Sequence, residues 1–225
     1  MHRIFIGLDE RQPVSYNVLS HSIVARTSEP VAVIPLKLDT LPLKRCGLTP
    51  FTFSRFLVPY LCEFKGMALF MDLDILVRGD IAELFALADE NYAAQVVKNK
   101  IKFEWASMIM FNCSHPSNAV LTPEYVEKAE GLHKLSWLDE KEVGDLPAEW
   151  NHCVGYDEQR PDAKLIHYTQ GVPAFPETMG CEHAEAWLME GQRMTSTRPW
   201  SELMGNSVHA QHVYQRLSQQ GAANG

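Results

Sequence analysis

MALFMDLDILV, residues 67–77, is the stretch that decides the fold of this chain. Its first five residues, Met67–Met71, are all apolar and follow a glycine, a pattern typical of a short buried strand. Asp72 ends this strand, and Asp74 follows before a second apolar run begins. The stretch therefore predicts a strand that delivers two carboxylates to its carboxyl end.

Strand and helix patterns alternate on both sides of this stretch. Strands are predicted at residues 3–7 and 31–35, a helix at 13–23, and another helix at 81–87, with Asp80 as its N-cap. This order predicts an α/β fold with a mostly parallel central sheet flanked by helices. Ligands bind such sheets at the carboxyl ends of the strands, where residues 9–11 and 72–74 would lie.

The remaining segments are less regular. Strands are predicted at 105–111 and at 165–168, the latter containing His167, and residues 53–64 form a helix interrupted at Pro59. The segment 119–129 is expected to be partly helical. Two further helices are predicted at 182–190 and 208–217.

Composition limits the class of protein. The 225 residues suit one domain, expected at 1–217, followed by a disordered tail at 218–225. The net charge of −8 argues against a nucleic-acid partner. The five cysteines are widely spread and predict reduced thiols in a cytoplasmic protein. Because no apolar stretch is long enough to span a bilayer, we expect no stable membrane anchor.

Asp72 and Asp74 are the first candidates for chemistry. A carboxylate among apolar residues costs roughly several kcal/mol to desolvate unless something compensates its charge. Mg²⁺ or Mn²⁺ would do so, because both prefer carboxylate oxygens and keep positions for substrate phosphates. A D-x-D pair can equally cap a turn. His167 could add a nitrogen ligand to the same metal, or be a hydrogen-bonded histidine at the rim of the core.

Five motifs in a fixed order resemble the family 8 glycosyltransferases, over residues 3–176. They are RIFIGLDE (3–10), TPFTFSRFLVPYL (49–61), ALFMDLDILVRGDIAELF (68–85), LPAEWN (146–151) and LIHYTQG (165–171). The resemblance implies a retaining enzyme with one nucleotide-binding domain of the GT-A fold. It also implies the metal ligands Asp72, Asp74 and His167.

Further roles follow from the same resemblance. Arg55 would stabilise the diphosphate or hold the donor sugar, and Asp139 and Glu140 would lie beneath that sugar, although an acidic stretch is as often a solvated loop. The residues expected to contact the nucleotide-sugar donor are Leu8, Asp9, Asp72 and Gly171.

The sequence departs from the family pattern in two places. Gly171 is followed by Val-Pro-Ala-Phe, so the lysine and tryptophan that the family places after its histidine are absent. Residues 105–107 are Trp-Ala-Ser, where the family has an asparagine for the donor sugar. Lys98, Lys100 and Lys102 are predicted on one strand face and could replace the missing lysine, or could simply form a solvated face.

The family resemblance implies a Mn²⁺- or Mg²⁺-dependent transferase that uses a nucleoside-diphosphate sugar, with UDP-glucose or UDP-galactose as the expected donor. A glycan, a lipid-linked saccharide and a protein all remain open as acceptors. Two alternatives are a catalytically silent sugar- or nucleotide-binding protein and a sugar-phosphate nucleotidyltransferase. The latter normally needs a basic, glycine-rich phosphate loop, whereas residues 7–13 read GLDERQP.

Overall fold

The computed structural model describes residues 1–195 of the chain. Contacts divide the chain into the units Met1–Gly191 and Gln192–Gly225, and every strand and helix described begins in the first. The predicted helix at 208–217 and the tail at 218–225 lie outside the described residues, as does the predicted domain boundary at residue 217.

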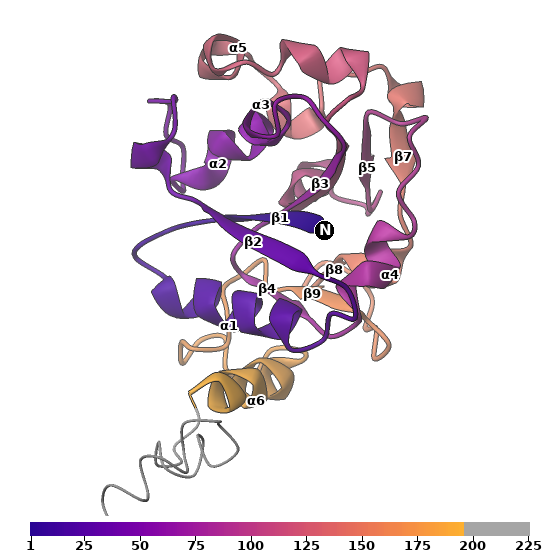
Figure 1. The fold of residues 1–225 in the computed structure, drawn as a ribbon. Coiled ribbons are helices and arrows are strands. Elements are labelled where there is room, and N and C mark those ends of the chain that lie inside the picture. Colours follow the sequence, from indigo (N-terminus) through magenta and orange to yellow (C-terminus); the bar gives the residue numbers. More distant parts are fainter. Residues whose placement is uncertain (196–225) are drawn as a thin grey trace, which may run out of the picture. The chain divides into compact units, whose positions relative to one another are not determined.

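Six strands form the main sheet in the order β2-β1-β3-β6-β5-β7 (Figure 1). The pairs β1–β2, β1–β3 and β5–β7 are parallel, whereas β6 runs antiparallel to both of its neighbours. The predicted α/β fold with a mostly parallel sheet is therefore confirmed. The strands are β1 (His2–Gly7), β2 (Val31–Leu36), β3 (Met67–Met71), β5 (Ala94–Val96), β6 (Met108–Asn112) and β7 (Val143–Asp145).

A smaller sheet has the order β4-β9-β8. Its strands are β4 (Ile75–Val77), β8 (His152–Cys153) and β9 (Leu165–His167). Strand β4 begins directly after Asp74 and pairs antiparallel with β9, which sets Ile75 opposite His167. Strand β8 pairs parallel with β9, which sets Cys153 opposite His167. This small sheet brings distant parts of the sequence to the end of β3.

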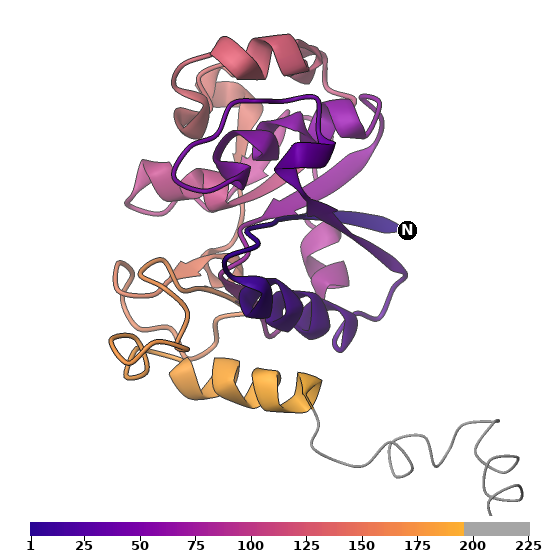
Figure 2. The same cartoon turned by 90° about the vertical axis from the view of Figure 1, so that its left-hand side faces the viewer.

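Helices cover both faces of the main sheet. Helix α1 lies on one side, and α2, α3 and α5 lie on the other (Figures 1 and 2). In α1, Val18, Leu19 and Ile23 are buried, while Val14 is 52% exposed and so lies outside the buried face. The helices are α1 (Pro13–Val24), α2 (Phe51–Ser54), α3 (Val58–Leu61), α4 (Ile81–Phe85), α5 (Pro123–Lys128) and α6 (Ala184–Met194).

The structure bears on two local predictions, a helix cap at Asp80 and a helix break at Pro59. Asp80 caps α4, because its carboxylate accepts the backbone N–H of Ala82 at 2.9 Å. The helix predicted at 53–64 is indeed broken, into α2, a 3₁₀ turn at Arg55–Leu57 and α3, but the break precedes Pro59. Proline is tolerated in the first turn of a helix, and Pro59 lies in the first turn of α3.

Two expectations for residues 98–111 are corrected. The predicted strand 105–111 begins only at Met108, because Lys102–Ser107 forms a 3₁₀ helix. Lys98, Lys100 and Lys102 do not share a strand face. Strand β5 ends at Val96, and the backbone N–H of Asn99 then turns back to the Val97 carbonyl at 2.9 Å.

The interior is filled by large apolar side chains on both sides of the main sheet. Trp150, Tyr168, Phe56, Phe70 and Phe111 are among the largest fully buried ones. Burying each aromatic ring in this way contributes about 2–3 kcal/mol. Within residues 1–195, no helix is both long enough and apolar enough to cross a bilayer.

Candidate metal and donor site

The D-x-D pair lies in the turn that joins the two sheets. The backbone N–H of Asp72 donates to the Ser107 carbonyl at 2.8 Å, which fixes the end of β3 against β6. The Asp74 carbonyl accepts from the backbone N–H of Tyr168 at 3.0 Å. Because β9 is aligned antiparallel with β4, the His167 Nε2 atom lies 3.3 Å from Asp74 Oδ1.

Asp72, Asp74 and His167 together form a set of possible metal ligands. One ligand atom from each lies within 4.8 Å of the others. Oδ1 of Asp72 and Oδ1 of Asp74 are buried, and their contacts are ion pairs, with Arg55 Nη1 and His167 Nε2, rather than well-aligned hydrogen bonds. Buried carboxylate oxygens normally accept hydrogen bonds, so two that face cationic groups instead are suited to a bound cation. Two carboxylates and an imidazole fit Mn²⁺ or Mg²⁺ with positions left for phosphate oxygens.

Arg55 lies against this cluster, as the motif comparison implied. Its side chain is 7% exposed, and its Nη1 lies 2.9 Å from Asp72 Oδ1. The same nitrogen donates to the Ala106 carbonyl at 2.7 Å, and the guanidinium stacks over the Phe70 ring. A buried cation is thereby fixed beside the carboxylates.

The electrostatics of the cluster oppose full ionisation. Burial raises the pKa of Asp72 to about 7, with Arg55 acting in the opposite direction and Asp74 adding repulsion. Burial also raises the pKa of Glu104. Burial acts against the charged imidazolium of His167, but attraction by Asp74 raises its pKa well above the usual value. Without a metal the cluster retains protons, and a bound cation would displace them.

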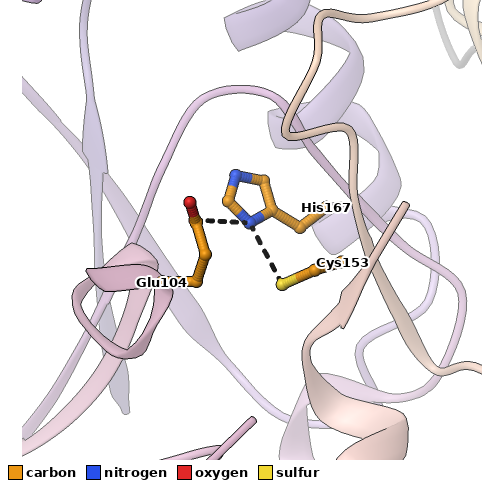
Figure 3. Close-up of side chains that lie close together, drawn as sticks. All are labelled: Glu104, Cys153 and His167. Carbon is orange, nitrogen blue, oxygen red and sulfur yellow. Dashed lines mark hydrogen bonds and ion pairs between the residues drawn. The ribbon is translucent and has the colours of Figure 1, made fainter. Parts of the chain in front are cut away.

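Glu104 and Cys153 face the other edge of the His167 ring (Figure 3). The Nδ1 atom lies 3.7 Å from Glu104 Oε2 and 3.8 Å from the Cys153 Sγ. The sequence pattern did not single out Glu104, and Cys153 was expected to be a packed thiol. The pairing of β8 with β9 brings Cys153 to the histidine, and no local sequence signal shows that pairing.

Two asparagines border the same cluster. Asn151 Nδ2 donates to the Ser107 hydroxyl at 3.0 Å, and Asn99 Nδ2 lies 3.1 Å from Cys153 Sγ. The amide oxygens of both are buried and accept no hydrogen bond among the described residues. Asn151 belongs to the LPAEWN motif, whereas nothing in the sequence singled out Asn99.

Leu8 and Asp9 line a separate hollow of about 520 Å³, together with Lys37, Leu43 and Pro50. The Asp9 carboxylate is 1% exposed and is held by Arg11, with Nε at 2.9 Å and Nη2 at 2.6 Å. Hydrogen bonds from Arg11 lower the pKa of Asp9 against the effect of burial. None of the three predicted metal ligands lines this hollow.

The structure does not bring Asp139 or Glu140 to the metal ligands. Asp139 forms a capping box with Glu142 at the start of a 3₁₀ turn. Glu140 lines a hollow of about 100 Å³ with Lys98, Lys102 and Trp105. The ion pairs and hydrogen bonds described for these two acids join them to neither Asp72 nor His167.

Gly171 closes the turn after β9. Its backbone N–H donates to the Tyr168 carbonyl at 2.8 Å, and its φ of +108° suits glycine alone. Lys164, on the other side of His167 in sequence, is bound to Glu83 at 2.7 Å and lies over the Trp150 ring. It is therefore no substitute for the missing lysine.

Two sequence comparisons agree with this geometry. Residues 14–128 match Glycosyl transferase family 8. Protein CDI of Arabidopsis thaliana is 37% identical over 220 residues, which cover 84% of this chain and 85% of that protein. The chain belongs to glycosyltransferase family 8. It is accordingly a transferase enzyme that acts on sugars.

Solved glycosyltransferases share the GT-A fold of this family 8 chain. The galactosyltransferase LgtC, solved with donor and acceptor sugar analogues, has a TM-score of 0.60 at 13% identity, covering 88% of this chain and 98% of LgtC. The bifunctional WbbM glycosyltransferase has a TM-score of 0.66 at 15% identity, covering 91% of this chain. The chain spans about half the length of WbbM, 51%. GlyE of Streptococcus pneumoniae TIGR4 has a TM-score of 0.61 at 15% identity, covering 92% of this chain and 63% of GlyE.

Proposed function

We propose that this chain transfers a hexosyl group from UDP-glucose or UDP-galactose to an acceptor hydroxyl with retention of configuration. The acceptor would be a glycan, a lipid-linked saccharide or a protein. The observation that supports this most is the convergence of Asp72, Asp74 and His167 beside the buried Arg55. Family membership supports glycosyl transfer itself, while the donor, the metal and the stereochemistry belong to the proposal.

The proposed cofactor is one Mn²⁺ or Mg²⁺ ion. Oxygen atoms of Asp72 and Asp74 and the Nε2 of His167 would hold it. Such an ion supplies Lewis acidity and neutralises charge on a diphosphate. The convergence of these three ligand atoms within 4.8 Å of one another, on buried carboxylates, is the structural support for this assignment.

Arg55 has a distinct role in the proposal. Its guanidinium is fixed by the Ala106 carbonyl and by Asp72, so it cannot turn away toward solvent. A fixed positive charge stabilises the negative charge that develops on the departing nucleoside diphosphate, without reorganising during the reaction. Glu104 lies behind His167, where a carboxylate orients a ligating imidazole.

The nucleobase and ribose are assigned to the hollow lined by Leu8 and Asp9. It lies at the carboxyl end of β1, where parallel sheets bind ligands. Arg11 already forms an ion pair with the Asp9 carboxylate. We therefore expect a ribose hydroxyl either to replace Arg11 at that carboxylate or to accept a hydrogen bond from Arg11.

The missing lysine has a candidate replacement. Lys98 and Lys100 flank Asn99, whose amide contacts Cys153 beside His167. Both lysines also line a hollow of about 470 Å³ with Arg160. We propose that this basic loop, residues 98–100, supplies the second cation for the diphosphate.

Calorimetric titration tests the donor site. Nucleoside diphosphates are titrated with and without Mn²⁺ into the wild type, Asp74→Ala and the control Asp162→Ala, which removes an exposed aspartate. We expect one nucleotide to bind only with metal, to lose binding in Asp74→Ala and to keep it in Asp162→Ala. If no nucleotide binds with any metal, the proposed metal-dependent donor site is wrong.

The absent lysine supports a second candidate, a protein that binds the donor without transferring it. Release of the nucleoside diphosphate from the nucleotide-sugar distinguishes the two. Metal-dependent binding with no release, neither with acceptors nor by hydrolysis, would favour the silent protein.

A further inference from the structure

A second group of metal-ligand side chains lies away from the D-x-D pair. His152 belongs to β8, and Glu182 and His183 immediately precede α6. The His152 Nε2 lies 3.0 Å from Glu182 Oε2, and the His183 Nε2 lies 3.1 Å from Glu182 Oε1. One ligand atom from each residue lies within 4.8 Å of the other two. Strand β8 and the residues before α6 thus bring two imidazoles and a carboxylate close together.

The spacing suits a small tetrahedral ion. Zinc bonds of 2.0–2.1 Å give a ligand-to-ligand distance of about 3.3 Å in a tetrahedron. The two nitrogen-to-oxygen distances, 3.0 Å from His152 to Oε2 of Glu182 and 3.1 Å from His183 to its Oε1, are close to this value. The two histidine rings stand nearly perpendicular, at 89°. The carbonyl oxygen of Arg160 lies 3.1 Å from His183 Nε2, so this oxygen or a water can fill the fourth position.

The charges around the cluster also favour a cation. Glu182 is in contact with two histidines, and no lysine or arginine side chain pairs with it in the described part of the chain.

The backbone of His183 has an unusual conformation. Its φ is +59°, in the left-handed region that residues other than glycine rarely adopt. Such positions persist where surrounding interactions over-determine them, often at ligand clamps. The Tyr168 hydroxyl fixes the His183 carbonyl at 2.9 Å while the ring turns toward Glu182.

We propose that His152, Glu182 and His183 bind one structural Zn²⁺ ion, separate from the donor metal. The chain forms no helix or strand between His167 and Ala184, so the ion would fasten the end of this long connection to β8. Strand β8 pairs with β9, which carries His167. The zinc would therefore hold β8, the neighbour of the strand that presents a donor-metal ligand.

Zinc content tests the proposal in the full chain. The Asp74→Ala background removes the donor metal site, and the protein is stripped with chelator, loaded with Zn²⁺, dialysed and analysed by elemental mass spectrometry. We expect one zinc per chain. Adding Glu182→Gln or His183→Asn should weaken zinc binding by at least about tenfold. Asparagine tolerates the left-handed backbone, so His183→Asn separates loss of the ligand from loss of the fold.

The control is His2→Gln in the same background. His2 forms a similar histidine–glutamate pair with Glu29, at 2.8 Å, without a third ligand. It should leave zinc content unchanged. Co²⁺ in place of zinc should give the intense absorption of a four-coordinate ion, lost with Glu182→Gln. If the Asp74→Ala chain retains no zinc, or if Glu182→Gln and His183→Asn both retain as much zinc as the His2→Gln control, the group is only a hydrogen-bond network.

Discussion

At the scale of single residues, His167 is the centre of the candidate site because both of its nitrogens are engaged. Nε2 faces Asp74 and Nδ1 faces Glu104 and Cys153, on a ring that is 3% exposed. An imidazole held on both edges keeps one orientation. That orientation determines whether a metal finds three ligands or two carboxylates alone.

Glu104 is accordingly predicted to be a positioning residue. Glu104→Gln should raise the Mn²⁺ concentration needed for half-maximal activity by about 10–100-fold, because the carboxylate no longer orients His167. Activity measured over a Mn²⁺ titration checks this, with the exposed Glu177→Gln as the matched control. A lower melting temperature with an unchanged metal requirement would instead assign Glu104 a purely structural role.

At the scale of elements, the donor site depends on how closely α2 approaches the end of β1. A Cβ on Gly7 would lie 2.3 Å from the Phe51 Cγ and 2.9 Å from its Cβ, at the base of a side chain whose residue is 4% exposed. Helix α2 leads directly into the turn that carries Arg55. The absence of a side chain at residue 7 therefore determines where the arginine lies.

Gly7→Ala should destabilise the protein by about 1–3 kcal/mol through overpacking. Urea unfolding measures this, and Gly180→Ala is the control because nothing lies within 4 Å of the added carbon. In a Phe51→Ala background, Gly7→Ala should lower the free energy of unfolding by less than it does in the wild type, because the phenylalanine that the added carbon would meet is absent. An unaltered unfolding midpoint in Gly7→Ala would show that α2 can shift away from β1 without loss of stability.

At the scale of the whole molecule, the stability of the chain should depend on pH through His133. This ring stacks on Phe103 and meets the edge of Phe56. Burial, reinforced by Arg55 and Arg45, lowers the pKa of His133 to about 4. The unfolded histidine, with a pKa of about 6.5, takes up a proton first as pH falls. Stability from this group is therefore present above pH 6.5 and is lost between about pH 6.5 and pH 4.

Replacing His133 by phenylalanine should remove that dependence. Between pH 7.5 and pH 5 the wild type should lose about 1–2 kcal/mol more of its free energy of unfolding than His133→Phe. Urea unfolding at both pH values gives the comparison, and the control is the half-buried His115 changed to glutamine, which should not reproduce the effect of His133→Phe. Equal losses in wild type and His133→Phe would mean that His133 does not titrate in this range in either state.

The sequence by itself determined the elements around MALFMDLDILV. Apolar patterns located β1, β2, β3 and α1 to within a residue, because the strands are continuous apolar runs and α1 buries one face. It failed at residues 98–107, where the alternating lysines suggested a strand. There the backbone turns back at Asn99, and this turn ends the strand despite the alternating pattern of the side chains.

The residues of the candidate site also fall into two groups, those that the sequence indicated and those that only the tertiary structure revealed. Ordered motifs indicated Asp72, Asp74, His167 and Arg55, since local sequence carries those side chains to strand and helix ends. Only the tertiary structure showed that Glu104 and Cys153 lie behind His167, and that His152 meets Glu182 and His183. Both groups depend on the pairing of the short strands β8 and β9, whose hydrogen bonds join residues from separate loops. Strands of two and three residues have too little pattern to predict their partners, so their pairing is decided by packing over the whole fold.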